Sequence, residues 1–211
     1  KTPLKLSPDD FEINRTEHMT QTATVLLLDQ SRSMGMFGSF SAAKKVALAL
    51  YWLIKSEYPR DYFNVIGFSD YGMEIKTDDL AELTWNAWVS GTNMQHALLL
   101  ARKVLSRQKV ATKQILMITD GEPTAHLEGG RAQFSYPPSW QTLDETLKEV
   151  KRCTQEGITI NTFMLESNYY LMDFIDKMTR INKGRAFYTD PSQLGKYVMV
   201  DYLKSRRKRI A

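Results

Sequence analysis

Oxygen-bearing side chains gather at three places in the sequence, each at the end of an apolar run or the start of a predicted helix. These places are the segments 29–33 (DQSRS), 91–93 (GTN) and 119–121 (TDG). Together they offer two carboxylates and three hydroxyls, from Asp29, Ser31, Ser33, Thr92 and Asp120. Hard cations such as Mg²⁺, Mn²⁺ or Ca²⁺ prefer oxygen ligands, whereas zinc or copper would favour nitrogen or sulfur. The residue types therefore predict a divalent-cation site, with Mg²⁺ as the first choice.

Each of these residues also has an ordinary structural explanation when it is taken alone. The serines could be turn residues, Thr92 or Asn93 could cap a helix, and Asp120 could belong to a turn. Three matching segments in order, all at strand ends or helix starts, favour the metal site over these separate explanations.

The elements that must position these segments alternate between short apolar strands and amphipathic helices. Strands are predicted at 23–29, 63–69, 113–120, 158–165 and 185–190, with a short edge strand at 72–77. Helices are predicted at 41–58, with Ser41 as N-cap, and at 92–108, 140–156, 170–182 and 192–209. This alternation predicts a doubly wound, Rossmann-like α/β fold in three layers. Its mostly parallel sheet of about six strands would have one short antiparallel edge strand, and helices would cover both faces. In such sheets ligands bind outside the carboxyl ends of the strands, where the three segments fall.

Length and composition indicate one globular domain over 1–211, with its folded core at about 10–205. Apolar residues make up 43% of the chain, yet no apolar run reaches the roughly 18 residues that span a bilayer. The lone cysteine, Cys153, excludes an internal disulfide framework, and with the lack of a signal peptide it favours the cytoplasm. Because the chain starts at Lys1, it could be excised from a longer protein.

The net charge of +4 depends largely on the segment 204–209 (KSRRKR). A basic cluster can bind nucleic acid or anionic lipid. We interpret this one as the solvated end of a helix, whose cations complement the helix dipole. Nucleic-acid binding is therefore not expected.

Apolar side chains surround the three polar segments in the sequence. They are Met36, Phe37, Trp85, Trp88, Phe134 and Tyr136. The last two belong to the segment 126–140, whose Gly-Gly and Pro-Pro pairs predict a long functional loop. Aromatic and methionine side chains beside a polar anchor are typical of protein interfaces, so we predict that these residues contact a partner. The alternative is that the two tryptophans fold back over the core.

The three polar segments resemble the metal-ion-dependent adhesion site of von Willebrand factor A (vWA) domains, and the strand–helix alternation extends this resemblance over most of the chain. The resemblance implies that Ser31, Ser33 and Thr92 touch the metal, while Asp29 and Asp120 act directly or through water. It also implies that an Asp or Glu of a protein partner fills the open coordination position.

A finer resemblance is to bacterial intracellular members of the family. The stretches that carry it are AAKKVALAL, YPRDYFNVIGFSD, GTNMQHALLLAR, KQILMITDGEPTAHL, INTFML and GRAFYTDP. They are similar to vWA proteins encoded beside MoxR-type AAA+ ATPases or related to magnesium-chelatase subunits. This resemblance implies an adaptor or assembly factor that works with such an ATPase or its substrate.

Two other functions stay open from the sequence. A metal-dependent phosphohydrolase would need a base or nucleophile near Asp29, for which Glu122 and His126 are the candidates. The chain lacks the motifs GxxxxGK[ST], GxSxG and HExxH, so we expect no enzymatic activity. An extracellular adhesion module is the other alternative, which the absence of disulfides and of a signal sequence disfavours.

Overall fold

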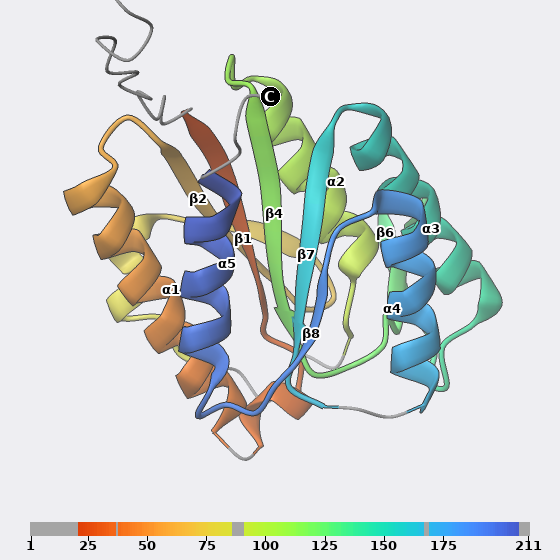
Figure 1. Ribbon diagram of the computed structural model, residues 1–211. Helices are drawn as coiled ribbons and strands as arrows, with labels where there is room; N and C mark the ends of the chain where they lie inside the picture. Colours follow the sequence, from red (N-terminus) through yellow and green to blue (C-terminus); the bar gives the residue numbers. More distant parts are fainter. Residues whose placement is uncertain (1–20, 37, 86–90, 167–168, 207–211) are drawn as a thin grey trace, which may run out of the picture.

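The computed structural model describes residues 21–36, 38–85, 91–166 and 169–206, which form an α/β fold (Figure 1). Its central sheet has six strands in the order β3-β2-β1-β4-β7-β8. Their bounds are Thr22–Asp29 (β1), Tyr62–Phe68 (β2), Gly72–Ile75 (β3), Thr112–Thr119 (β4), Ile158–Met164 (β7) and Ala186–Tyr188 (β8). Neighbouring strands are parallel except for β2 and the edge strand β3, which are antiparallel. The predicted mixed sheet is therefore confirmed.

Helices cover both faces of this sheet and complete the three layers (Figure 1). Their bounds are Ser39–Glu57 (α1), Met94–Ser106 (α2), Trp140–Gln155 (α3), Tyr169–Asn182 (α4) and Leu194–Arg206 (α5). The side chains of α1 and α5 form one buried cluster with the sheet, and those of α2, α3 and α4 form the other. Both faces of the sheet are thus shielded from water.

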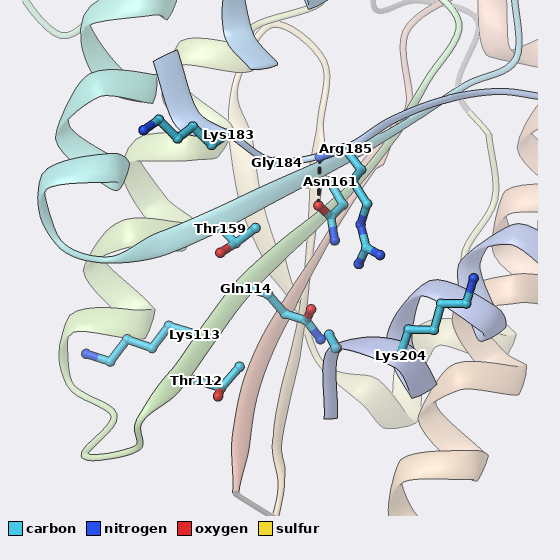
Figure 2. Close-up of a pocket in the computed structure, with 10 residues that line it drawn as sticks. Thr112, Lys113, Gln114, Thr159, Asn161, Lys183, Gly184, Arg185 and Lys204 are labelled. Atoms are coloured by element: carbon cyan, nitrogen blue, oxygen red, sulfur yellow. Dashed lines mark hydrogen bonds between the residues drawn. The ribbon is translucent and has the colours of Figure 1, made fainter. Parts of the chain in front are cut away.

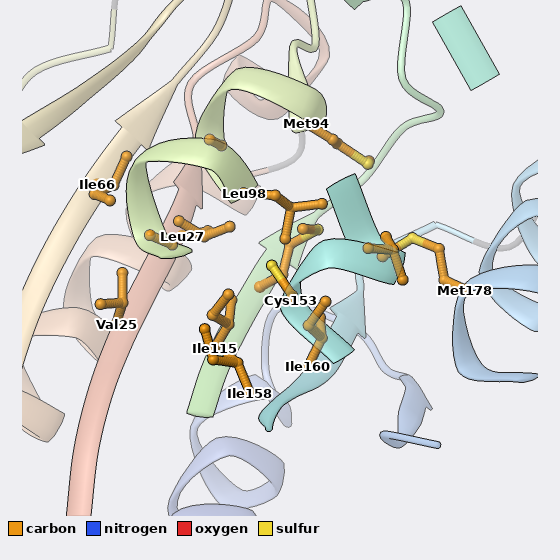
Figure 3. Close-up of a cluster of buried hydrophobic side chains, with 14 of the residues drawn as sticks. Val25, Leu27, Ile66, Met94, Leu98, Ile115, Cys153, Ile158, Ile160 and Met178 are labelled. Carbon is orange, nitrogen blue, oxygen red and sulfur yellow. The ribbon is translucent and has the colours of Figure 1, made fainter. Parts of the chain in front are cut away.

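The central strand β1 is buried along its whole length, and its middle residues 25–28 are all apolar. Successive side chains of a strand point to opposite faces, so Val25 and Leu27 join the cluster with α2 while Leu26 joins the cluster with α1. Figure 3 shows Leu27 beside Leu98 of α2, in the same buried cluster as Val25 and Cys153 of α3. Burial raises the pKa of the Cys153 thiol to about 12, so this cysteine is a packing residue of the core.

The segment 126–140 differs from the predicted loop. Most of it is a β-hairpin, in which β5 (Ala125–Glu128) pairs antiparallel with β6 (Arg131–Phe134). Gly129 and Gly130 form its turn, and both have positive φ angles that glycine adopts without a steric penalty. The two glycines that suggested a loop are the turn between two short strands.

Two helix starts also differ from the prediction. Helix α1 begins at Ser39 after Gly38, whose φ of 76° places it in the left-handed region, so Ser41 is not the N-cap. Helix α2 begins at Met94, and the Asn93 side chain caps it by accepting a hydrogen bond from His96 N. Thr92 therefore precedes the helix and is free of the capping role.

The end of α5 is anchored to the start of the sheet by Asp61. One carboxylate oxygen of Asp61 accepts from the Tyr202 hydroxyl at 2.9 Å and pairs with Arg206, while the other accepts from Thr22 N at 3.2 Å. The Arg206 guanidinium also lies 3.7 Å from the ring centroid of Tyr58. The side chain of Arg206 is only 6% exposed. The interpretation of this basic end as solvated is therefore wrong for Arg206, while residues 207–209 lie outside the described part.

Among the residues that the structure describes, none of the helices is both long enough and apolar enough to cross a bilayer.

Removal of one core side chain tests this packing. We expect Leu27→Ala to lower the free energy of unfolding by about 2–5 kcal/mol, because the fully buried side chain would leave a cavity. Met73→Ala is the control, since Met73 is 68% exposed and its loss leaves no buried cavity. Urea unfolding of both variants measures the effect, and equal stabilities would contradict the packing described here.

Candidate metal centre

The parallel pairing of β1 with β4 brings the first and third polar segments together. Leu28 of β1 is in register with Ile118 of β4, so Asp29 and Thr119 follow side by side at the carboxyl edge of the sheet. The Thr119 hydroxyl donates to Asp29 Oδ2 at 2.5 Å. Asp29 is therefore held at the end of the sheet by the neighbouring strand.

The loop after β1 turns its oxygens toward Asp120. Ser31 N donates to Asp29 Oδ1 at 2.8 Å, which closes a tight turn. The hydroxyls of Ser31 and Ser33 lie 3.2 Å apart, and the Ser33 hydroxyl donates to Asp120 Oδ1 at 2.7 Å. These contacts link four of the five predicted ligands into one chain of hydrogen bonds, which runs from Asp29 to Asp120.

Thr92 is positioned from both sides through its backbone. Its N–H donates to the Thr124 hydroxyl at 2.9 Å, and its carbonyl accepts from Thr124 N at 3.1 Å. The residues beside it are tied to Asp70 after β2, because Gly91 N donates to Asp70 Oδ1 and Asn93 Nδ2 donates to Asp70 O. The structure therefore holds Thr92 between the loop after β2 and the segment that follows Asp120.

Burial sets the electrostatics of the two carboxyl groups. Asp29 is fully buried, and desolvation, followed by the charge of Asp120, raises its pKa to about 7. The pKa of Asp120 is also raised, chiefly by desolvation and further by the nearby Glu166 carboxylate. A hydrogen bond from Ser33 opposes this rise. Burial and mutual repulsion make it unfavourable for both carboxyl groups to be ionised at once. A cation bound between them would attract both carboxylates and so favour their ionised forms.

The donor set fits a hard divalent cation. It consists of carboxylate and hydroxyl oxygens, and Mg²⁺, Mn²⁺ and Ca²⁺ are held by such ligands together with water. Within the described ranges, no group of three or more His, Cys, Asp or Glu side chains forms a metal site. Any cation here would thus depend on the hydroxyls of Ser31, Ser33 and Thr92 and on water as well as on the two aspartates.

The predicted partner-contact residues fall into three groups. Met36, Phe134 and Tyr136 are 54%, 53% and 80% exposed. Trp85 is half-buried, and its indole N–H donates to Ser31 O at 3.1 Å, so it supports the loop that carries the serines. A side chain at Gly35 would collide with this indole. Phe37 and Trp88 lie outside the described residues, and a partner contact stays a prediction for the whole set.

Three residues that support the site were missed from the sequence: Asp70, Thr124 and Glu166, the last of which acts on Asp120 through its charge. Thr119 stood in the quoted segment 119–121 and Trp85 among the predicted partner contacts, but their hydrogen bonds to Asp29 and Ser31 were not foreseen. Asp70 and Glu166 carried a usable signal, because each follows the carboxyl end of a parallel strand, β2 or β7. The roles of Thr124 and Trp85 depend on tertiary contacts that no local pattern shows.

The two candidates for a catalytic base are placed differently. His126 lies on β5 and is buried, with Nδ1 hydrogen-bonded at 2.9 Å to the Thr142 hydroxyl of α3. Glu122 is partly exposed, and desolvation raises its pKa. No described hydrogen bond joins either side chain to Asp29 or Asp120. Their geometry therefore adds nothing to the phosphohydrolase alternative.

The raised pKa of Asp29 predicts how the metal-free protein responds to pH. The unfolded chain loses this proton near 3.8, whereas the folded protein keeps it until about 7. The stabilisation from this group is thus complete below about pH 4 and is lost as the pH rises through 7, at about 1.4 kcal/mol per unit of pKa difference. Urea unfolding in EDTA at about pH 5 and about pH 8 measures the loss. Asp29→Asn should remove it, and an unchanged pH dependence in this variant would contradict the assignment.

Comparison with known proteins gives the family. The model of the vWA domain of Rv0959-like proteins matches residues 22–203. The proteins Rv0959 of Mycobacterium tuberculosis (strain ATCC 25618 / H37Rv) and Mb0984 of Mycobacterium bovis are each 38% identical to this chain over 210 residues. The match covers 97% of this chain and 31% of each relative, so the chain spans about a third of their length.

Solved structures share the fold at low sequence identity. The vWF domain of the type V pili tip protein Mfa5 from Porphyromonas gingivalis has a TM-score of 0.67 at 13% identity, and 92% of this chain and 98% of that one are covered. A von Willebrand factor type A structure from Catenulispora acidiphila has a TM-score of 0.63 at 16% identity, with 91% and 44% covered. The pilus adhesin SpaC from Lactobacillus rhamnosus GG has a TM-score of 0.68 at 17% identity, with 92% and 31% covered. These likenesses show the fold. The family model that matches residues 22–203 shows that the chain belongs to the vWA-domain family of Rv0959-like proteins.

Proposed function

We propose that this domain binds a divalent cation, Mg²⁺ in the first place, and uses it to capture a carboxylate of a protein partner. One observation carries the proposal. Asp29 and Asp120 are buried together at the carboxyl edge of the sheet, and no Lys or Arg among the described residues forms an ion pair with either of them. Buried carboxylates are normally paired or coordinate metals, and this pair has hydroxyl groups around it in place of a cationic side chain.

The proposed ligands would hold the cation in two ways. Ser31, Ser33 and Thr92 would offer hydroxyl oxygens, and the aspartates would bind the cation directly or through water. When bound, the cation supplies a Lewis-acidic position that attracts an anionic oxygen. The hydrogen bonds of Thr119 and of Ser31 N fix the Asp29 carboxylate in advance, which lowers the ordering that binding requires.

The exposed apolar side chains near this edge support a protein as the ligand. Met36, Phe134 and Tyr136 expose more than half of their surface. Interfaces commonly combine a polar anchor with aromatic and methionine contacts of this kind. We therefore propose that the cation captures an Asp or Glu of the partner while these side chains provide apolar contact.

The proposed partner is a MoxR-type AAA+ ATPase, or a substrate of that ATPase, in the bacterial cytoplasm. The support for this partner is the resemblance of the segments quoted above to vWA proteins encoded beside such ATPases. The single cysteine supports the cytoplasm. In this proposal the domain is an adaptor or assembly factor and performs no chemical reaction itself.

Thermal or urea unfolding with added Mg²⁺ tests whether the protein binds this cation at the proposed site. Wild-type protein should gain about 2.7 kcal/mol at a Mg²⁺ concentration one hundred times the dissociation constant. Asp29→Asn and Ser33→Ala should lose this gain, because each removes a proposed ligand while it preserves most of the side-chain volume. Asp79→Asn is the matched control, since Asp79 is exposed and distant from the three segments in sequence. Equal Mg²⁺ stabilisation of Asp29→Asn and wild type would refute the site.

A pull-down from native cytosol tests the partner. We expect an AAA+ ATPase to be recovered in Mg²⁺ and to be lost both in EDTA and with Asp29→Asn. Circular dichroism of the variant checks that the fold survives. Unchanged recovery in EDTA would show that partner binding does not need the metal. Recovery in Mg²⁺ of neither an AAA+ ATPase nor one of its substrates would refute the proposed partner.

A further inference from the structure

A hollow lies at the amino edge of the sheet, at the opposite end of the strands from the candidate metal centre. Its volume is about 360 Å³, and it is lined by the first residues of β4, by residues of β7, by the turn before β8 and by the end of α5. Figure 2 shows the Gln114 and Asn161 amides and the Arg185 side chain around its centre, with lysine side chains at its rim.

The charges around this hollow are strongly unbalanced. Lys113, Lys183, Arg185 and Lys204 line it, and they come from β4, the turn before β8, and α5. The three lysines form no ion pair with any described residue, whereas exposed lysines on α3 and α4 pair with neighbouring acids. A cleft lined by one sign of charge focuses the field and concentrates ions of the opposite sign.

Among the described residues, Asp201 is the carboxylate that pairs with a cation of this hollow. Asp201 Oδ1 pairs with Arg185 at 2.5 Å, and Asp201 Oδ2 accepts from Asn161 Nδ2 at 2.5 Å. Asn161 is 1% exposed, and its Oδ1 accepts from Arg185 N at 3.0 Å. This buried amide therefore orients both the acid and the arginine. Lys204 also acts on Asp201 through its charge, whereas Lys113 and Lys183 have no ion-pair partner among the described residues.

The backbone of the turn before β8 is held at a close approach to β7. Lys183 has a φ of 58°, a left-handed conformation that is uncommon for residues other than glycine. A side chain at Gly184 would collide with the carbonyl of Ile160. Asn182 anchors the turn further by accepting from Ile160 N at 2.6 Å and donating to Ile158 O at 2.9 Å. Arg185 thus leaves a fixed turn, and its position beside the hollow is set before any ligand arrives.

We propose that this hollow binds a phosphate-bearing anion. A phosphate carries more negative charge than a carboxylate and accepts more hydrogen bonds, and arginine and lysine are the side chains that proteins use to hold it. Cations from three separate elements fit a group that can be contacted from several sides. The volume admits a ligand larger than a single phosphate group, so a pyrophosphate should bind more tightly than inorganic phosphate.

This site is independent of the proposed cation site. The two lie at opposite ends of the strands, and no residue belongs to both. Binding at the hollow is therefore expected in EDTA and in the Asp29→Asn variant, so failure of one proposal does not imply failure of the other.

An NMR titration of ¹⁵N-labelled protein with pyrophosphate, in EDTA and at constant ionic strength, tests the proposal. We expect saturable shifts of the Lys113, Gly184 and Arg185 amides. The double variant Lys113→Gln/Lys204→Gln should weaken binding by between about twofold and 25-fold, because each surface charge contributes a change in affinity of about 1.4- to fivefold. The control Lys45→Gln/Lys151→Gln changes the net charge equally at exposed positions outside the hollow and should bind as wild type does.

A flotation assay with phosphatidylcholine vesicles that contain phosphatidylinositol 4,5-bisphosphate distinguishes the source of the phosphate. Pyrophosphate binding without vesicle binding supports a free phosphorylated ligand. Vesicle binding that the Lys113→Gln/Lys204→Gln variant loses, and the control keeps, supports a phosphorylated headgroup. The absence of saturable binding in both assays, or an equal loss in the control variant, would overturn the proposal.

Discussion

The parallel pairing of β1 with β4 is the constraint on which the candidate metal centre depends. It sets two strand ends side by side, and so it places Asp29 next to Thr119 and brings the loop after β1 within reach of Asp120. Parallel strands need crossover helices, and those helices bury the sheet on both faces. The same burial that favours apolar residues along β1 also removes water from Asp29. The fold thus makes ionisation of the Asp29 carboxyl group unfavourable at this edge of the sheet, and a bound cation would offset that unfavourable energy.

Periodicity predicted the four central strands and the helices, because each of them is long enough to show its pattern. The short strands β3 and β8 were predicted from their place in the alternation of strands and helices. The hairpin was missed for a physical reason. Strands β5 and β6 have four residues each and pair only with one another among the described strands. Such short strands show too little alternation to be separated from a loop. The start of α1 was misplaced because the helix is capped by Gly38, which has no side chain to mark a cap, whereas the cap was expected at Ser41.

The residues of the candidate site could be predicted from the sequence, but the hydrogen bonds that hold them in place could not. Asp29, Ser31, Ser33 and Asp120 stand at strand ends, and strand ends can be located from sequence. Thr124 lies near Thr92 only because the chain turns back after β4, and Trp85 reaches Ser31 across 54 positions of sequence. The hollow at the amino edge is still harder to predict from the sequence. Its lysines look like ordinary surface charges until the sheet gathers them from separate elements.

The anchor at Asp61 has a mechanical consequence. Through one carboxylate, the amino ends of β1 and β2 are joined to the last turn of α5. A pulling force applied beyond α5 would therefore load the buried Arg206–Asp61 pair before it reached the rest of the helix. Because that pair is nearly dry, its rupture would leave charges without water. Under tension applied at this end of the chain, the first interaction to resist unfolding would thus be the Arg206–Asp61 pair. It lies at the amino edge of the sheet, far from the candidate metal centre.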